Sequence, residues 1–183
     1  MKLVVLAITY IPERKSASFL LRDLCEDLVK EGHEVNIITF ADWIESKLFY
    51  EEINGVKVNR IKIPKDNNSR IKRALIELSL SYRAIKFFKR GSIERPDGIV
   101  FYSPSIFFGK AIKFLKQKWN IKSFLIIRDI FPDWAVDIGI LKKGIIYSFF
   151  KYFEKIMLIN SDFIGVESKK DINHCRDISP KSD

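Results

Sequence analysis

The residue types best suited to chemistry in this sequence lie in one segment, Arg128–Gly139, which reads Arg-Asp-Ile-Phe-Pro-Asp-Trp-Ala-Val-Asp-Ile-Gly. Arg128 closes an apolar run, so its charge requires a partner or a ligand if that run is buried. Asp129 follows at once and is suited to be that partner, or a general base that accepts a proton from a substrate hydroxyl. Asp133 follows a proline, as at a helix start, and we expect it to cap a short helix that Gly139 ends, or to contact substrate.

A second group of polar residues follows the first apolar run, which covers 3–8. In parallel sheets ligands bind beyond the carboxyl ends of the strands, and a helix N-terminus attracts anions. The loop that leads into the next predicted helix lies at such a place. Its candidate substrate-binding residues are Tyr10, Glu13, Arg14, Lys15 and Ser16. The alternative is a capped, solvated turn.

Several common sites are missing from the sequence. No G-x-G-x-x-G follows the first strand, and neither a P-loop motif nor a G-x-S-x-G elbow occurs. These absences disfavour a nicotinamide-dependent enzyme, a P-loop NTPase and an α/β-hydrolase. His33 and His174 lack metal-ligand spacing. His174-Cys175 stands near Asp171 and Asp177, but we expect no metal site there.

The elements that must position these residues follow from the hydrophobic pattern. Continuous apolar runs predict strands covered on both faces, and apolar residues three and four apart predict helices. The expected strands are 3–8, 34–40, 97–102, 122–128 and 162–166, with a hairpin about Asn54-Gly55; the expected helices are 16–31, 70–90, 105–117 and 143–159. Ser16 or Ser18 is expected to cap the helix at 16–31, and Gly32 to follow its end.

This alternation predicts an α/β fold, a Rossmann-like three-layer domain with a mostly parallel sheet of about six strands. The chain of 183 residues has the length of one domain. We assign it to 1–166, with the start of a helix and a polar tail at 167–183. Cys25 and Cys175 are far apart in sequence, which suits a reducing compartment. No apolar run reaches the roughly eighteen residues of a transmembrane helix.

The net charge of +9 is unevenly distributed. Residues 60–90 hold ten basic and two acidic side chains, and residues 110–128 hold six basic and no acidic ones, so the rest of the chain is net acidic. The helix at 70–90 therefore combines a basic face with an apolar stripe of Ile71, Ala74, Leu75, Leu78, Tyr82, Ile85 and Phe88. Such a helix is suited to an anionic membrane surface. The alternative is a core helix with a solvated basic face. The membrane-facing candidates are Arg70, Lys72, Arg73, Arg83, Lys86, Lys89 and Arg90.

Five short pieces, in order and at sensible spacing over nearly the whole chain, resemble the N-terminal domain of family 4 glycosyltransferases of the GT-B type. They are Tyr10-Ile11-Pro12-Glu13; Leu24–Val35, similar to the "L-A-x-x-L-x-x-x-G-H-E-V" pattern; Gly55–Arg60; Arg128–Gly139; and Ser161–Val166. The fourth looks like the "R-D-[LI]-[WF]-P-[ED]" segment of enzymes that make bacterial surface polysaccharides, including fucosamine-transferase-like members.

The resemblance implies that the two domains of the enzyme bind different substrates. In this fold the N-terminal domain mostly holds the acceptor, while the C-terminal domain holds the nucleotide sugar and supplies E-x7-E-type carboxylates. The sequence ends before such a domain. We therefore expect no cofactor in this chain, no turnover by this chain alone, and a nucleotide-sugar donor in the C-terminal domain.

Two departures from the family pattern bear on the site. Many members carry two glycines in the first loop, where Lys15-Ser16 stand here. Many also carry a histidine near the end of the fifth strand, where Arg128 stands here. A histidine-centred role therefore cannot be transferred, and Asp129 is the better polar candidate.

The sequence thus predicts the acceptor-binding domain of a retaining glycosyltransferase. Its acceptor would be a lipid-linked sugar for O-antigen or capsule synthesis. The enzyme would be cytoplasmic and peripheral, at the inner face of the cell membrane. A different class remains open: a non-enzymatic basic α/β module that binds anionic membrane or a protein partner. We expect no nucleic-acid partner, because no recognition motif accompanies the charge. Self-association through an exposed cleft is a further expectation.

Overall fold

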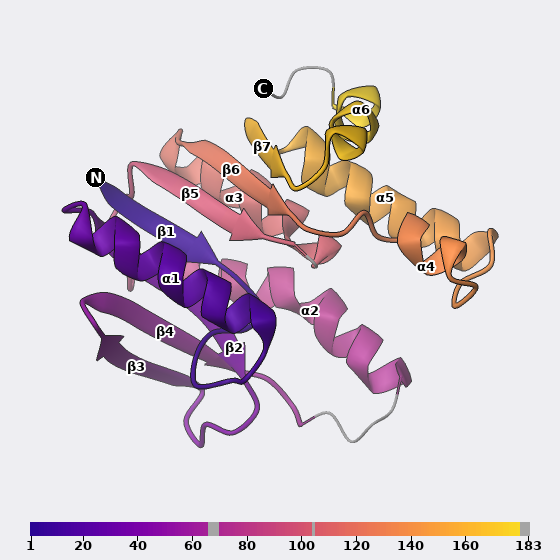
Figure 1. Ribbon diagram of the computed structural model, residues 1–183. Helices are drawn as coiled ribbons and strands as arrows, with labels where there is room; N and C mark the ends of the chain where they lie inside the picture. The colour runs from indigo at the N-terminus through magenta and orange to yellow at the C-terminus, as the bar shows by residue number, and fades with distance from the viewer. Residues whose placement is uncertain (66–69, 104, 180–183) are drawn as a thin grey trace. The chain divides into compact units, whose positions relative to one another are not determined.

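The computed structural model describes residues 1–65, 70–103 and 105–179 (Figure 1). Its strands form a seven-stranded sheet in the order β3-β4-β2-β1-β5-β6-β7. The chain divides into two compact units, Met1–Val100 and Phe101–Asp183, and the boundary falls within β5. The α/β, Rossmann-like class expected from the sequence is confirmed.

The first unit contains one helix between parallel strands, then a hairpin and a long helix. Its elements are β1 (Lys2–Leu6), α1 (Ser16–Lys30), β2 (Glu34–Ala41), β3 (Leu48–Ile53), β4 (Val56–Lys62) and α2 (Arg70–Lys89), and β5 (Gly98–Tyr102) begins in it. β2 pairs in parallel with β1 and β4, while β3 and β4 are antiparallel. Asn54 and Gly55 both have positive φ, +50° and +81°, so the predicted hairpin is confirmed.

Helix α1 ends as the sequence predicts but begins differently. Gly32 has φ +82° and donates its N–H to the carbonyl of Val29, while His33 donates to Leu28, the paired bonds of a Schellman motif. The expected serine cap is wrong, because Lys15 occupies the N-cap without a side-chain bond. Ser18 is instead fully buried, and its hydroxyl lies 2.8 Å from that of Thr9.

Helix α2 buries a different face from the predicted stripe. Leu75 and Tyr82 are 61% and 68% exposed, whereas Leu80, Ala84 and Phe87 are buried. The predicted stripe runs along the whole helix, but only the second half of the helix has a buried face. Ile71 and Phe88 fall at the ends of the stripe; Phe88 is buried, and the side chain of Ile71 lies outside the described residues.

The second unit places helices around the end of the sheet that β6 and β7 form. Its elements are the rest of β5, η1 (Ile106–Phe108, a 3-10 turn), α3 (Gly109–Trp119), β6 (Lys122–Ile127), α4 (Asp133–Asp137), α5 (Ile145–Ile159), β7 (Phe163–Val166) and α6 (Lys169–Ile178). The single helix expected at 105–117 is thus a 3-10 turn followed by an α-helix. β6 and β7 are parallel, with Phe124 opposite Phe163. The predicted polar tail at 180–183 lies outside the described residues.

Aromatic packing ties α5 to the segments before it. The ring of Phe107 lies 5.0 Å from that of Phe153, and the ring of Phe131 lies 4.9 Å from that of Phe150, in edge-on geometries. Edge-to-face pairs contribute about 0.5–1.5 kcal/mol beyond the burial of their area. Phe131 stands between the candidate residues Asp129 and Asp133, so this packing fixes the backbone that carries them. Within the described ranges, the structure holds no helix long and apolar enough to span a bilayer.

Candidate functional site

The loop after β1 carries its polar groups in a small hydrogen-bonded set. The Glu13 carboxylate accepts from the Thr9 hydroxyl at 2.9 Å and from the Lys15 ammonium at 2.6 Å. Arg14 and Ser16 are exposed, and Ser16 is the first residue of α1. Four of the five predicted loop residues are thus at least partly open to solvent at a helix N-terminus.

Tyr10 is the exception in this loop. Its side chain is fully buried, and burial raises the pKa of its phenol. Its hydroxyl has no hydrogen-bond partner among the described residues. A ligand can reach Tyr10 only if the loop moves, so in this conformation the side chain packs rather than binds.

Arg60 stabilises the loop after β1, although it is not among the residues predicted from the sequence. Among the residues that the structure describes, it is the largest fully buried side chain, and its guanidinium lies 2.6 Å from the Glu51 carboxylate and 5.2 Å from the centre of the Trp43 ring. It also donates to the carbonyl of Ile11, inside the loop. A buried arginine needs such partners, because unpaired charge in a core is strongly unfavourable.

The segment after β6 places its two leading residues in different surroundings. Arg128 donates from Nε to the Glu167 carboxylate at 2.8 Å, and a bond to the Tyr102 phenol together with the charge of Glu167 raises its pKa. Its partner is therefore Glu167 rather than the expected Asp129. Asp129 is exposed, just beyond the carboxyl end of β6. A carboxylate there is open to a hydroxyl group of a bound molecule.

The sequence predicts that Asp133 caps α4, and this prediction is wrong. Pro132 occupies the N-cap, and Asp133 is the first helical residue. Its carboxylate accepts from the Tyr147 hydroxyl at 2.6 Å and from the Lys151 ammonium at 3.1 Å, both on α5. Gly139, with φ +76°, follows the end of α4 as predicted.

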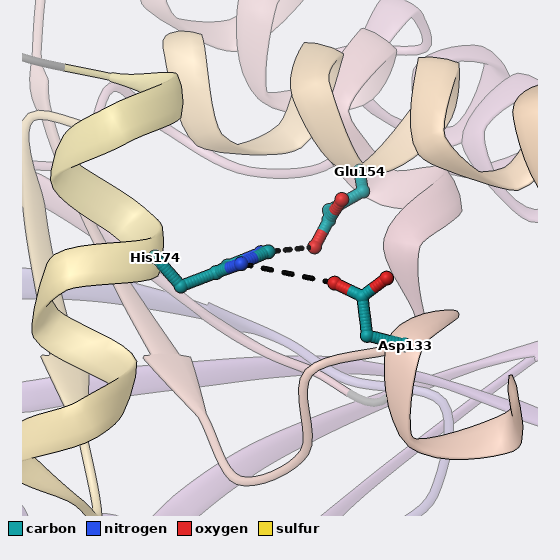
Figure 2. Close-up of side chains that lie close together, drawn as sticks. All are labelled: Asp133, Glu154 and His174. Atoms are coloured by element: carbon teal, nitrogen blue, oxygen red, sulfur yellow. Dashed lines mark hydrogen bonds and ion pairs between the residues drawn. The ribbon is translucent and has the colours of Figure 1, made fainter. Parts of the chain in front are cut away.

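Figure 2 shows that His174 of α6 points between Asp133 of α4 and Glu154 of α5. Its Nε2 lies 2.7 Å from Glu154 Oε1, and its Nδ1 lies 3.7 Å from Asp133 Oδ2. Lys151 also pairs with Glu154. Five side chains from three helices therefore form one ion-pair cluster, which we call the α4–α5–α6 cluster: Asp133, Tyr147, Lys151, Glu154 and His174.

The cluster keeps Asp133 ionised. Burial opposes the ionisation of Asp133, but bonds from Tyr147 and Lys151, with the charges of Lys151 and His174, outweigh it and lower the pKa of the carboxyl. The same bond raises the pKa of Tyr147 to about 12. Asp133 therefore holds helices together, and a direct contact of Asp133 with substrate stays a prediction.

Three members of this cluster offer donor atoms that a divalent cation accepts. The candidate ligand atoms of Asp133, Glu154 and His174 all lie within 4.8 Å of one another. Because the Lys151 ammonium already pairs with both carboxylates, ion pairing accounts for the arrangement. The grouping of His174 with Cys175 considered from the sequence does not form a site of this kind; Cys175 is buried, and burial raises the pKa of its thiol to about 11.

The predicted membrane-facing residues at 70–90 differ in how exposed their side chains are. Lys72, Arg73, Lys86, Lys89 and Arg90 are exposed. Arg83 is half-buried and donates to the carbonyl of Lys62. The side chain of Arg70 lies outside the described residues.

Two of the missed residues had a signal in the sequence. Arg60 follows Val56 and Val58 at every second position of a strand, and this spacing places it on the buried face. Glu154 precedes Met157 and Leu158 by three and four residues, and all three are buried. Glu167, the partner of Arg128, lies thirty-nine residues further along the chain and had no such signal.

Comparison with solved structures supports the fold class. Sucrose-phosphate synthase from Thermosynechococcus elongatus matches 100% of this chain with a TM-score of 0.70 at 15% identity. The catalytic domain of starch synthase IV from Arabidopsis thaliana, bound to ADP and acarbose, matches 90% with a TM-score of 0.62 at 12% identity. An α,α-trehalose-phosphate synthase from Burkholderia xenovorans, in complex with glucose-6-phosphate, matches 96% with a TM-score of 0.61 at 10% identity.

These similar structures are glycosyltransferases of the GT-B type, and the chain has the Rossmann-like fold of one half of them. It spans 46%, 44% and 42% of the three chains, less than half of each. Neither a protein-family model nor a curated protein matches the sequence.

Proposed function

We propose that this chain is the acceptor-binding domain of a retaining glycosyltransferase, which transfers a sugar from a nucleotide-sugar donor to a lipid-linked acceptor in bacterial surface-polysaccharide synthesis. The observation that carries the proposal is the match of the whole chain to one half of sucrose-phosphate synthase. The fucosamine-transferase-like subgroup is part of the proposal, and it rests on the Arg128–Gly139 segment. The donor nucleotide would bind to a C-terminal half of the enzyme.

The segment after β6 supplies the residues for the acceptor. Asp129 is exposed beyond the strand and can accept a hydrogen bond from an acceptor hydroxyl, which orients the attacking oxygen. Arg128, the residue before Asp129, carries a positive charge, and its guanidinium pairs with the Glu167 carboxylate. In the loop after β1, Glu13 with Arg14 and Lys15 offers further polar contacts to a sugar or a phosphate.

A test of acceptor binding uses flotation of vesicles that contain a polyprenyl-diphosphate-linked N-acetylglucosamine. We expect the chain to float with these vesicles more than with undoped vesicles of the same lipid, and Asp129→Ala to reduce the difference. Asp137→Ala is the matched control, because Asp137 is also exposed and lies in the same segment. Equal flotation with and without the acceptor would contradict the proposal, and binding to DNA at equal ionic strength would favour a different polyanion.

The proposed place, at the inner face of the cell membrane, has support in the second unit. Ile138, Ile140, Ile145 and Ile146 are 61%, 72%, 91% and 61% exposed. Lys142 and Lys143 stand among them, and residues 138–153 contain no Asp or Glu. Exposed isoleucines beside lysines match an anionic bilayer surface, where each basic residue contributes about 1 kcal/mol.

The apolar part of this surface can be tested separately from the charge. We expect Ile145→Ser with Ile146→Ser to reduce flotation with anionic vesicles several-fold. Ile159→Ser, an exposed position at the other end of the same helix, should leave flotation unchanged. An equal loss in both variants would show that α5 makes no specific contact with the membrane.

A further inference from the structure

The first unit contains a cavity of about 410 Å³ between the β3–β4 hairpin and α2. Its cationic lining residues are Lys47, Lys62, Arg83, Lys86 and Arg90, and its lining contains no Asp or Glu. Cavities that hold small organic ligands have volumes of roughly 300–1,000 Å³, so this one is large enough for a ligand. None of its lining residues belongs to the loop after β1 or to the segment after β6.

The cations converge on this cavity from two elements. On the hairpin, Lys47 and Lys62 are adjacent across the strands, because the N–H of Lys62 donates to the carbonyl of Lys47 at 3.0 Å. On α2, Arg83 and Lys86 are three residues apart and share one face. Arg90 follows four residues later, in the turn just after the helix ends. Like charges placed opposite each other on paired strands, or at helical spacing, are destabilising on their own.

The described residues do not neutralise this charge. Over the described ranges 1–65, 70–103 and 105–179, no carboxylate forms an ion pair with any of the five cations. Lys62 donates to the backbone carbonyl of Glu45 at 2.7 Å. Arg83 donates to the carbonyl of Lys62 at 3.0 Å and to the Ser79 hydroxyl at 2.9 Å. These bonds to neutral groups fix the two side chains in place and leave their positive charge uncompensated.

The floor of the cavity is apolar. Ile61 and Phe87 are buried beneath it, and Leu48 and Ile63 line it with partly exposed side chains. A cationic rim above an apolar floor is complementary to a molecule with an anionic head and an attached apolar group. Arginine and lysine bind phosphate through charge-assisted hydrogen bonds, so phosphate is the head that this rim fits best.

We propose that this cavity binds a phosphate or diphosphate ester that carries an apolar group, with the phosphate on the five cations and the apolar group on the floor. Such a ligand has two sources, a phosphorylated lipid or a small soluble phosphate. The apolar floor distinguishes them, because it contributes affinity only when the phosphate carries a hydrocarbon group. The inference rests on the cavity's own residues. Because the lipid-linked acceptor of the proposed function would carry the same group, the two are separated by variants, Lys47→Ala with Lys86→Ala for the cavity and Asp129→Ala for the acceptor site.

The probes are geranyl diphosphate, inorganic pyrophosphate and geraniol, each titrated into the chain by isothermal calorimetry at low ionic strength. We expect geranyl diphosphate to bind at least about tenfold more tightly than pyrophosphate, and geraniol not to bind measurably. Raising the salt concentration should weaken binding, because the rim is open to solvent and its charges are screened. Absence of binding, equal affinity for the two diphosphates, or binding of geraniol would each overturn the proposal.

Variants locate the binding in the cavity. Lys47→Ala with Lys86→Ala removes two exposed cations from opposite sides and should weaken binding of geranyl diphosphate at least about tenfold. Lys113→Ala with Lys155→Ala removes the same charge from exposed positions in the second unit and should leave the affinity unchanged. Circular dichroism confirms that both double variants fold. Equal weakening in the two would overturn the assignment to this cavity.

Discussion

Buried charge holds both candidate segments in position. Arg60 is fully buried and supports the loop after β1 through the carbonyl of Ile11. Glu154 is 2% exposed and binds Lys151 and His174 next to Asp133. An ion in a protein core is stable only in the geometry that pairs it, so these side chains specify one arrangement of their neighbours. Removing one partner should therefore lower the free energy of unfolding by more than the intact ion pair adds to it.

The first prediction concerns Arg60→Met. This change leaves Glu51 without its partner and Ile11 without its donor, so we expect the free energy of unfolding to fall by about 2–4 kcal/mol. Urea denaturation followed by circular dichroism measures the difference. Lys57→Met is the control on the same strand; its pair with Glu34 is partly exposed and screened by solvent, so we expect a much smaller loss of stability. A loss for Arg60→Met no larger than that of the control would contradict the supporting role.

The second prediction concerns pH and Asp162. Its carboxylate accepts from the N–H and hydroxyl of Ser123 at 2.9 and 3.0 Å and lies 2.7 Å from the Lys116 ammonium. Burial opposes the ionisation of Asp162, but these bonds outweigh it and lower its pKa. A group with a lowered pKa stabilises the fold above its ordinary pKa of about 3.9, and this contribution is lost as the pH falls through the folded-state pKa.

Asp162→Asn should therefore destabilise the chain most at neutral pH, and the difference from the wild type should shrink below about pH 4. Urea midpoints at pH 7, 4 and 3 measure this trend. Asp177→Asn, which removes an exposed carboxylate from α6, is the matched control. A difference between Asp162→Asn and the wild type that stays constant over this range would rule out the ionised carboxylate as the cause.

At the scale of elements, the second unit depends on a close approach of two helices. A Cβ on Gly109, the first residue of α3, would lie 2.7 Å from the backbone nitrogen of Met157 on α5. Hydrogen bonds within the helix hold this backbone, so it yields little to such a contact. Gly109 therefore sets the distance between α3 and α5, and α5 in turn carries Tyr147, Lys151 and Glu154 of the α4–α5–α6 cluster.

Gly109→Ala is the third prediction. Alanine normally stabilises a helix relative to glycine, by about 1 kcal/mol, but here the clash reverses the sign and we expect a loss of about 1–3 kcal/mol. Thermal unfolding measures the change. Gly144→Ala, at the start of α5, meets nothing within 4 Å and should change stability little. Stabilisation by Gly109→Ala would show that the helices separate without cost.

What the sequence could predict at this scale is local. Continuous apolar runs identified the strands, and Asn54-Gly55 identified the hairpin, because turn chemistry and strand burial are encoded by neighbouring residues. The buried face of α2 and the ion-pair partner of Arg128 depend on segments far along the chain, and one sequence carries no direct signal for them. The hydrogen bonds of Asp133 are of this second kind, since Tyr147 and Lys151 lie on the next helix. The sequence therefore indicated candidate residues more readily than the partners of those residues.

At the scale of the whole molecule, each compact unit contains one buried thiol. Cys25 lies in the first unit and Cys175 in the second, and burial raises their pKa values to about 12 and about 11. Because the thiolate is the reactive form, both thiols should react with a disulfide reagent roughly a hundredfold or more slowly than a small free thiol. Each rate therefore reports how often the surroundings of that cysteine open.

The labelling rates of these two thiols can show which unit a destabilising substitution opens. Cys25→Ser and Cys175→Ser leave one reporter each, and Gly109→Ala is introduced into both. Local openings occur in the least stable contiguous region and need not involve the whole chain. We therefore expect Gly109→Ala to accelerate labelling of Cys175, which lies in the same unit, and to leave Cys25 nearly unchanged. Equal acceleration of both thiols would mean instead that the chain opens as one cooperative structure, and that the boundary within β5 does not separate two regions of different stability.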